Sequence, residues 1–274
     1  MNYIKFSFIV EPVQPGSDVL IALLGENGFE SFSEAENGFD AFVQESELDR
    51  NTLPQEKDVE GFSFTYTEEK QEQKNWNAEW EKSFSPVFVE DYCCIRAPFH
   101  EKPNGFRLDI LITPKMSFGT GHHDTTRLMT KNLFETEVQS KTVLDMGCGT
   151  AVLAIVAKKL GAKKVVGIDI DDWSVENGKE NCDVNGVGEI EILKGDASLL
   201  GTEKFDLILA NINRNVLLKD IPVYASVLNP KGKLMLSGFF ESDFDQLINR
   251  CAEFSLNLIK KETSNTWGIL VFEK

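Results

Sequence analysis

The chain has 274 residues, with 44 acidic residues against 28 basic ones and a formal net charge of −16. Residues 1–90 hold 19 acids and 6 bases, so most of the negative charge belongs to the first third of the chain. Such an acidic chain repels phosphate backbones, and its longest apolar stretches are well short of the roughly 20 residues that a membrane-spanning helix needs. We therefore expect no direct contact with nucleic acid and none with a membrane.

The five cysteines indicate a reducing environment. They form an odd number without Cys-x-x-Cys spacing, which disfavours both a disulfide framework and a structural zinc site. The N-terminal stretch alternates like a strand and lacks the small-residue cleavage site of a signal peptide. These features predict a cytoplasmic protein.

Residues 1–68 are predicted to form a small acidic α+β domain. Residues 3–10 alternate like a strand, residues 16–25 carry apolar side chains at helical spacing, and three Phe-rich segments with a period of two follow. The segment contains no His, no Cys and no Gly-rich loop. We interpret it as a structural or recognition module rather than a catalytic one.

Residues 69–85 are predicted to form a helix that links two domains. Trp76, Trp80 and Phe84 are spaced four apart, which places the three rings on one helical face. We interpret this face as the one by which the helix docks. A contribution of Trp76 to a substrate cleft is the alternative.

Residues 86–274 are assigned to a second domain, with its core sheet in about 141–274. From residue 141 onward, continuous Val/Ile/Leu strands alternate with amphipathic helices. This pattern predicts an α/β fold with a doubly wound, mostly parallel sheet that is covered on both faces. In such sheets ligands bind beyond the carboxyl ends of the strands.

The segment from Asp145 to Gly149 lies where a predicted strand turns into a helix. Gly147 and Gly149 permit a tight turn and let a ligand approach with no Cβ in the way. A dinucleotide-binding loop would place a third glycine where this chain has Val152. Asp145 would oppose a phosphate, so a cationic ligand such as S-adenosylmethionine is favoured.

Acids also follow the next two predicted strands. Asp169 is placed to accept hydrogen bonds from two ribose hydroxyls, and Asp196 is placed near an adenine. Either acid alone is equally consistent with a helix cap or a turn residue. Together with the glycine loop, they resemble the class I S-adenosylmethionine-dependent methyltransferases over about residues 120–274.

The fourth predicted strand of this sheet ends at Asn211, on the side where a methyl acceptor would lie. Methyl transfer is an in-line displacement, so an enzyme mainly has to position donor and acceptor. The carbonyl of an Asn side chain can hold the N–H groups of a neutral amine and aim its lone pair at the methyl group. We therefore predict Asn211 as the catalytic residue, with an ordinary loop cap as the alternative.

A loop rich in Gly, Thr and His precedes the sheet and ends at Thr126. His122 and His123 are adjacent, but neighbouring side chains in an extended loop point apart and no further ligand lies nearby, so we expect no metal site. Thr125 or Thr126 is expected at the start of the following helix, where its hydroxyl would reach the cofactor carboxylate.

These motifs together resemble the ribosomal protein methyltransferase family PrmA over nearly the whole chain. The resemblance is carried by the 118–121 loop (Phe-Gly-Thr-Gly), the 75–80 segment (Asn-Trp-Asn-Ala-Glu-Trp), the glycine loop and the Asn-Ile pair at 211–212. The family loop runs Gly-Thr-Gly-Thr-His-Pro-Thr-Thr, and here His122 and Asp124 replace its second Thr and its Pro.

The resemblance implies cofactor contacts from Thr126, Gly147, Asp169 and Asn211. The full set of predicted cofactor-binding residues is Thr125, Thr126, Asp145, Gly147, Gly149, Asp169, Asp196 and Asn211. The substrate-side candidates are Phe118, His123 and Trp76.

The resemblance also implies an activity: transfer of methyl groups from S-adenosylmethionine to lysine ε-amines, and to an N-terminal α-amine, of a basic large-subunit ribosomal protein. The first domain, ferredoxin-like, would grip that protein, and its negative charge suits a basic partner. A class I methyltransferase acting on RNA or on a small-molecule amine is the alternative within the fold. A non-catalytic module and an NAD-dependent oxidoreductase are disfavoured, the first by the acids at the strand ends and the second by Val152.

Overall fold

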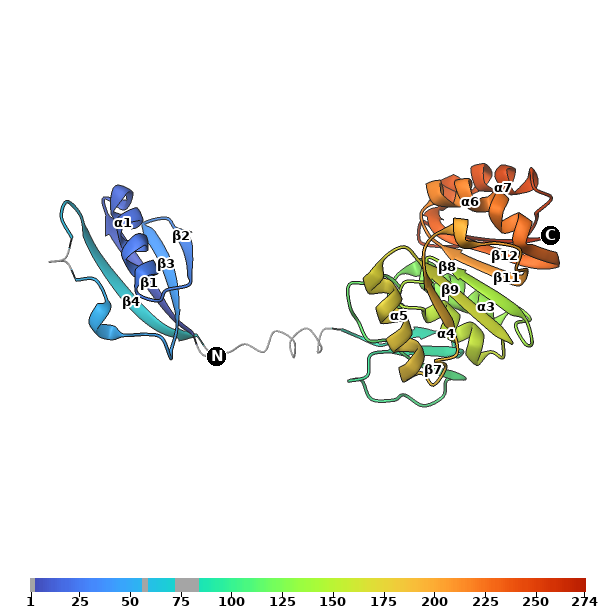
Figure 1. The fold of residues 1–274 in the computed structure, drawn as a ribbon, viewed down its shortest axis with the longest axis horizontal. Helices are drawn as coiled ribbons and strands as arrows, with labels where there is room; N and C mark the ends of the chain where they lie inside the picture. The colour runs from blue at the N-terminus through green and yellow to red at the C-terminus, as the bar shows by residue number, and fades with distance from the viewer. Residues whose placement is uncertain (1–2, 56–58, 72–83) are drawn as a thin grey trace. The chain divides into compact units, whose positions relative to one another are not determined.

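The protein is described by a computed structural model that covers residues 3–55, 59–71 and 84–274. It divides into two compact units, Met1–Ser83 and Phe84–Lys274 (Figure 1). One hydrophobic cluster fills the first unit, and two clusters lie on the two faces of the main sheet in the second.

The first unit is an antiparallel sheet with a helix on one face. Strands β1 (Tyr3–Glu11), β2 (Ser31–Ala35), β3 (Gly38–Gln44) and β4 (Ser63–Gln71) stand in the order β2-β3-β1-β4, and α1 (Val13–Glu26) packs on β1 and β3. This is the strand order of a ferredoxin-like sheet. The chain between β3 and β4 contains a single 3₁₀ turn within its described residues.

Strand alternation explains the core of this unit. Every second residue of β1 faces α1, and the rings of Phe8 and Phe39 stack at 4.9 Å between centroids. The side chains that fill the core from β1 and α1 are Ile4, Phe6, Phe8, Val10, Leu20 and Leu24. The Phe-rich composition is therefore used to build a small core from few residues.

The linker helix expected from residue 69 to 85 is wrong at both ends. Residues 69–71 belong to β4, because they continue its antiparallel pairing with residues 3–5 of β1. Phe84 and Ser85 lie outside any helix. The ring of Phe84 packs against His122 at 4.6 Å between centroids, and its carbonyl oxygen accepts a hydrogen bond from the ring of His100 at 2.6 Å. Residues 72–83, with Trp76 and Trp80, lie outside the described residues.

The second unit begins with a small sheet of β5 (Val87–Val89), β6 (Cys93–Arg96) and β7 (Leu108–Leu111). Three asparagines spaced four apart, two on helix α5 (Asp172–Val184) and one at its C-cap, bond the chain at the end of β7 and just after it. Asn185 pairs with both backbone groups of residue 111, Asn181 accepts from the amide of residue 113, and Asn177 donates to the carbonyl of residue 113. This ladder fixes the point where the chain enters the loop toward the ligand site.

The main sheet contains seven strands. Their bounds are β8 (Thr142–Met146), β9 (Lys164–Asp169), β10 (Glu191–Lys194), β11 (Phe205–Asn211), β12 (Leu228–Phe240), β13 (Asn257–Ser264) and β14 (Trp267–Glu273). They stand in the order β10-β9-β8-β11-β12-β14-β13, all parallel except β14, which runs antiparallel to both of its neighbours.

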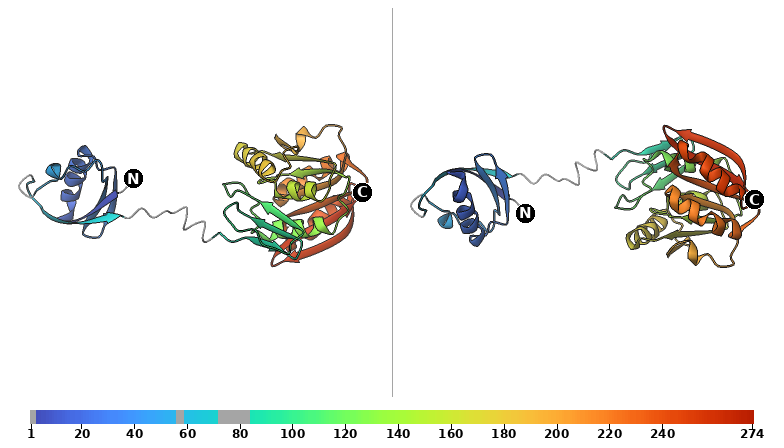
Figure 2. Two further views of the ribbon diagram at one scale, coloured as in Figure 1. Left: turned by 90° about the horizontal axis from the view of Figure 1, so that it is seen from below. Right: turned by 90° about the horizontal axis from the view of Figure 1, so that it is seen from above.

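Helices cover both faces of this sheet, as Figures 1 and 2 show. The first face carries α3 (Asp124–Phe134), α4 (Val152–Lys159) and α5 (Asp172–Val184), and the second carries α6 (Arg214–Val227) and α7 (Phe244–Ala252). In Figure 2 the view from above has orange α6 and red α7 in front of the sheet. The predicted doubly wound, mostly parallel sheet is confirmed.

The strand order reverses between β8 and β11, which lie side by side at the centre. From β8 the chain proceeds outward to β9 and β10, and from β11 it proceeds the other way to β12. Such a switch point leaves a crevice at the carboxyl ends of the strands. None of the described helices has the length and apolar character to cross a membrane.

Candidate functional site

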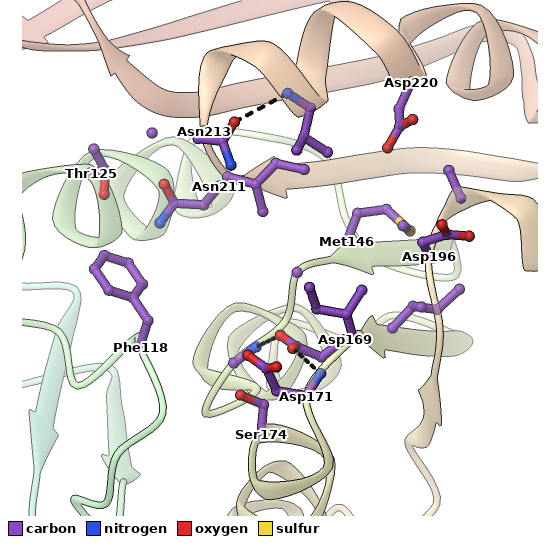
Figure 3. A pocket seen from close by; sticks show the side chains of 18 of the residues that line it. Phe118, Thr125, Met146, Asp169, Asp171, Ser174, Asp196, Asn211, Asn213 and Asp220 are labelled. Atoms are coloured by element: carbon purple, nitrogen blue, oxygen red, sulfur yellow. Dashed lines mark hydrogen bonds between the residues drawn. The ribbon is translucent and has the colours of Figure 1, made fainter.

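A cavity of about 560 Å³ opens at the carboxyl ends of β8, β9, β10 and β11 (Figure 3). It draws its lining from these strand ends, from the 116–125 loop, from α5 and α6, and from the start of β14. The predicted site residues that line it are Phe118, His123, Thr125, Gly147, Gly149, Asp169, Asp196 and Asn211.

The glycine loop is left-handed at both of its glycines. Gly147 has φ +67° and Gly149 has φ +52°, a region that side chains disfavour. A Cβ on Gly147 would lie 2.2 Å from Cγ2 of Ile212, and one on Gly149 would lie 2.2 Å from the carbonyl oxygen of Phe118. The absence of a Cβ is thus needed by the protein's own packing as well as by a ligand.

Thr150 ties the glycine loop to the 116–125 loop. Its amide donates to the carbonyl of Phe118 at 2.9 Å, and its hydroxyl donates to the carbonyl of Gly119 at 2.7 Å. The side chain of Phe118 is therefore positioned beside the cavity by a residue of the glycine loop.

Asp169 is the best-supported carboxylate of the cavity. Its two oxygens accept from the amides of Gly149 at 2.8 Å and Asp171 at 3.1 Å, as the dashed lines of Figure 3 show. These bonds fix the carboxylate between the glycine loop and the start of α5. It lies at the end of β9, where the sequence places a ribose-binding acid.

Asp145 lies beneath the glycine loop and is absent from the cavity lining. It is 1% exposed, and its Oδ2 accepts from the amide of Ala154 at 3.1 Å in α4. Burial raises the pKa of the Asp145 carboxyl to about 7, with a further contribution from Asp169 and opposition from the Ala154 N–H. This hydrogen bond links Asp145 of β8 to helix α4.

The charge of the cavity is strongly one-sided. Asp169, Asp171, Asp196 and Asp220 line it, and no Lys or Arg does so among the described residues. Opposite charge attracts and like charge repels most strongly where solvent is restricted. The cavity therefore suits a cationic ligand and disfavours a phosphate.

Asn211 carries an unsatisfied acceptor. Its Oδ1 is buried without a hydrogen-bond partner among the described residues, although Asn211 lines the cavity. The nearby Asn213, by contrast, uses its Oδ1 to accept from the amide of Val216 at 3.1 Å and caps α6. A buried acceptor without a partner marks a place where a ligand N–H can bind.

The two threonines of the loop differ in position. Helix α3 begins at Asp124 and is capped by His123, whose Nδ1 accepts from the amide of Thr125 at 3.3 Å. Thr125 lines the cavity. Thr126 does not line it, and its hydroxyl oxygen is buried without a partner among the described residues.

Aromatic rings surround one end of the cavity. The ring of His123 contacts Phe118 at 5.3 Å and Trp267 at 4.5 Å between centroids, and Trp267 contacts Phe240 at 4.3 Å. Figure 3 shows Phe118, Thr125 and Asn211 together at this end. The substrate-side candidates Phe118 and His123 are thus brought together, whereas Trp76 lies outside the described residues.

Several lining residues are missing from the predicted set, among them Trp173, Trp267 and Asp220. Trp173 lies in the first turn of α5 and Trp267 is the first residue of β14, at element ends where the sequence carries little periodic signal. Asp220 did leave a signal, because it interrupts the apolar stripe that Leu217, Ile221 and Tyr224 form on α6.

A seven-stranded sheet with one antiparallel strand, and an acid-lined cavity at its switch point, define a class I methyltransferase. The carboxylate of Asp169, and a lining without Lys or Arg among the described residues, fit S-adenosylmethionine, which carries a sulfonium and an ammonium group. S-adenosylmethionine is the cofactor of this class. The fold class predicted from the sequence is therefore confirmed.

The chain belongs to the ribosomal protein L11 methyltransferase family (PrmA), whose model matches residues 22–274. A ribosomal protein L11 methyltransferase of Bacteroides fragilis is 42% identical over 99% of this chain and 99% of its own length. One of Porphyromonas gingivalis is also 42% identical, over 99% of this chain and 98% of its own length. The resemblance noted in the sequence is confirmed.

Solved structures agree with this assignment. The ribosomal protein L11 methylase of Lactobacillus delbrueckii subsp. bulgaricus matches with a TM-score of 0.65 at 31% identity, covering 69% of this chain and 98% of that chain. A methyltransferase of Pyrococcus furiosus matches with a TM-score of 0.51 at 22% identity, over 61% of this chain and 89% of that chain. The latter shows the shared fold alone.

Proposed function

We propose that this chain transfers methyl groups from S-adenosylmethionine to amino groups of a basic large-subunit ribosomal protein. The acceptors are lysine ε-amines and an N-terminal α-amine. The observation that carries the proposal is the buried, unpartnered Oδ1 of Asn211 at the aromatic end of an acid-lined cavity. The full-length relatives named as ribosomal protein L11 methyltransferases support this substrate. A ribosomal protein substrate also supports a cytoplasmic reaction.

The chain's own residues account for the positioning that the reaction requires. The cofactor supplies an electrophilic methyl group on a sulfonium. Asn211 Oδ1 accepts an N–H of the incoming neutral amine and turns its lone pair toward the donor, which raises the effective concentration of the two reactants. Phe118, His123 and Trp267 enclose the apolar stem of the lysine and keep water from the reacting amine.

The first unit is assigned the recognition of the ribosomal protein. The acids Glu34 and Glu36 are exposed beside the turn between β2 and β3, and neither is in an ion pair within the described residues. Free surface acids steer a basic partner toward a binding site and make association sensitive to salt. No direct nucleic-acid contact is proposed, since the charge has the wrong sign.

Reversing these two charges, in Glu34→Lys/Glu36→Lys, should raise the KM for the ribosomal protein by about threefold to tenfold at low salt. The value of kcat and the affinity for S-adenosylmethionine should not change, because the cavity lies in the other unit. The matched control is Glu137→Lys/Asp245→Lys, which reverses two exposed acids of the second unit. Equal KM values for both double variants at every salt concentration would remove the first unit's acids from recognition.

Incubation of unmethylated ribosomal proteins with the protein and isotope-labelled S-adenosylmethionine should label one large-subunit protein on lysine side chains and its N-terminus. Intact-mass and peptide mass spectrometry identifies the protein and counts the methyl groups. Label that appears only in ribosomal RNA, or only in added small amines, contradicts the proposal.

A further inference from the structure

The cavity holds a carboxylate that the proposed function leaves unused. Asp220 lies in the second turn of α6, four residues after Val216, and both side chains line the cavity. Asp220 is 6% exposed. Among the described residues its only hydrogen bond comes from the Tyr224 hydroxyl, at a long 3.4 Å, and no Lys or Arg forms a salt bridge with it.

A carboxylate in this position is costly without a ligand. Removing an ionised group from water is unfavourable unless hydrogen bonds or an opposite charge replace the water. Burial raises the pKa of the Asp220 carboxyl, Lys219 and the Tyr224 hydroxyl oppose that rise, and the neighbouring Asp196 adds to it. Uncompensated buried acids of this kind gather where a ligand supplies the missing donors.

Asp220 and Asp196 mark one end of the cavity. In Figure 3 they lie on the side opposite to Asn211, Thr125 and Phe118, with Asp169 below and between the two groups. We assign Asp169 to the ribose and Asn211 to the end where the methyl group is transferred. The remaining end, with Asp196 and Asp220, is therefore where the adenine base would bind. Met146, labelled near Asp196 in Figure 3, adds an apolar side chain to the lining there.

The two acids have different surroundings. Asp196 is exposed, and its Oδ1 already accepts from the amide of Ser198 at 2.9 Å. Asp220 is buried and its Oδ1 has no partner among the described residues. A hydrogen bond from a ligand N–H would therefore stabilise the carboxylate of Asp220 more than that of Asp196.

We propose that Asp220 is a second acceptor, beside Asp196, for the exocyclic amino group of the cofactor's adenine, and that it selects a 6-amino purine over a 6-oxo purine. The amino group has two N–H donors, which match two carboxylates. A 6-oxo purine would place its carbonyl oxygen, an acceptor, against the two carboxylates, which are also acceptors. Buried groups would then stay unpaired, so the site should reject this purine strongly. This inference rests on the proposed function, because it concerns the same site.

The test compares binding of S-adenosylhomocysteine and S-inosylhomocysteine by calorimetry. The wild type should bind the adenosyl compound at least about 100-fold more tightly. In Asp220→Asn this ratio should fall by about tenfold or more, since an amide can donate to the 6-oxo group. The matched control, Asp245→Asn, removes an exposed acid on α7 and should keep the wild-type ratio.

The outcomes separate the two hypotheses. A ratio in Asp220→Asn equal to that of the wild type overturns the assignment and leaves Asp220 as a structural partner of Tyr224. If the variant does not fold, the N6,N6-dimethyl analogue is measured on the wild type, where undiminished affinity overturns the assignment as well. Failure of the wild type to bind S-adenosylhomocysteine at all contradicts the proposed function itself, whereas equal binding of both compounds contradicts only the selection by Asp220.

Discussion

Replacing Asp169 with alanine should weaken S-adenosylmethionine binding by at least about 100-fold. The carboxylate accepts from the amides of Gly149 and Asp171, so it shapes the glycine loop and the start of α5 from below. It is also the acid that we assign to the ribose hydroxyls. Hydrogen bonds to a charged group are worth ~1.5–3 kcal/mol each, and losing two of them to the ligand accounts for this factor.

Calorimetric titration with S-adenosylmethionine measures the effect, and thermal unfolding reports whether the fold is kept. Asp172→Ala is the matched control, because this neighbouring acid is exposed, pairs with Lys194 and does not line the cavity. Asp169→Asn should fall between the wild type and the alanine variant, since its amide oxygen still accepts a hydrogen bond from one ribose hydroxyl. Wild-type affinity in Asp169→Ala would show that the cofactor is not held at the end of β9.

Replacing Asn211 with alanine should lower kcat for the ribosomal protein by on the order of 100-fold to 1000-fold. The side chain supplies an acceptor that no protein group satisfies, so its removal costs the folded state little. The amine then enters the cavity without the contact that orients its lone pair. The affinity for S-adenosylmethionine should change by only a few-fold.

Single-turnover kinetics with saturating cofactor isolates this step from binding. Asn215→Ala is the matched control, because Asn215 is exposed on α6 and its side chain bonds only Arg214 among the described residues. A turnover by Asn211→Ala equal to that of the control would remove Asn211 from amine positioning. A parallel loss of cofactor affinity would instead assign Asn211 mainly to the cofactor.

Sequence patterns located the edge of the sheet at which the cavity lies, because the ends of successive parallel strands lie at one edge. The carboxyl ends of β8, β9 and β11 meet at one edge of the sheet. Recognising these strands in the sequence was therefore enough to place Gly147, Asp169 and Asn211 near one another. The same patterns placed Asp145 at the ligand. In the structure its side chain points beneath α4, because side chains alternate along β8 and Asp145 faces the first layer of helices.

Such patterns do not predict contacts between segments that are far apart in the sequence. The residues at 69–71 are polar and carry no periodic signal of their own, yet they pair with residues 3–5 of β1. Trp267 reaches His123 only because β14 runs antiparallel to its neighbours, which brings its first residue to the cavity end of the sheet. Asp220 faces the cavity only through the placement of α6.

The amino-acid sequence by itself determined the chemistry of this protein: the alternation of strands and helices, the acids at three strand ends, the asparagine at the fourth, and the acidity of the first unit. These are local properties, and each follows from side-chain type and spacing. The tertiary structure alone decided which of these groups face the cavity and which lie beneath it. The tertiary structure also placed aromatic rings at one end of the cavity and Asp220 at the other. These positions depend on how the helices and the antiparallel strand pack across the sheet.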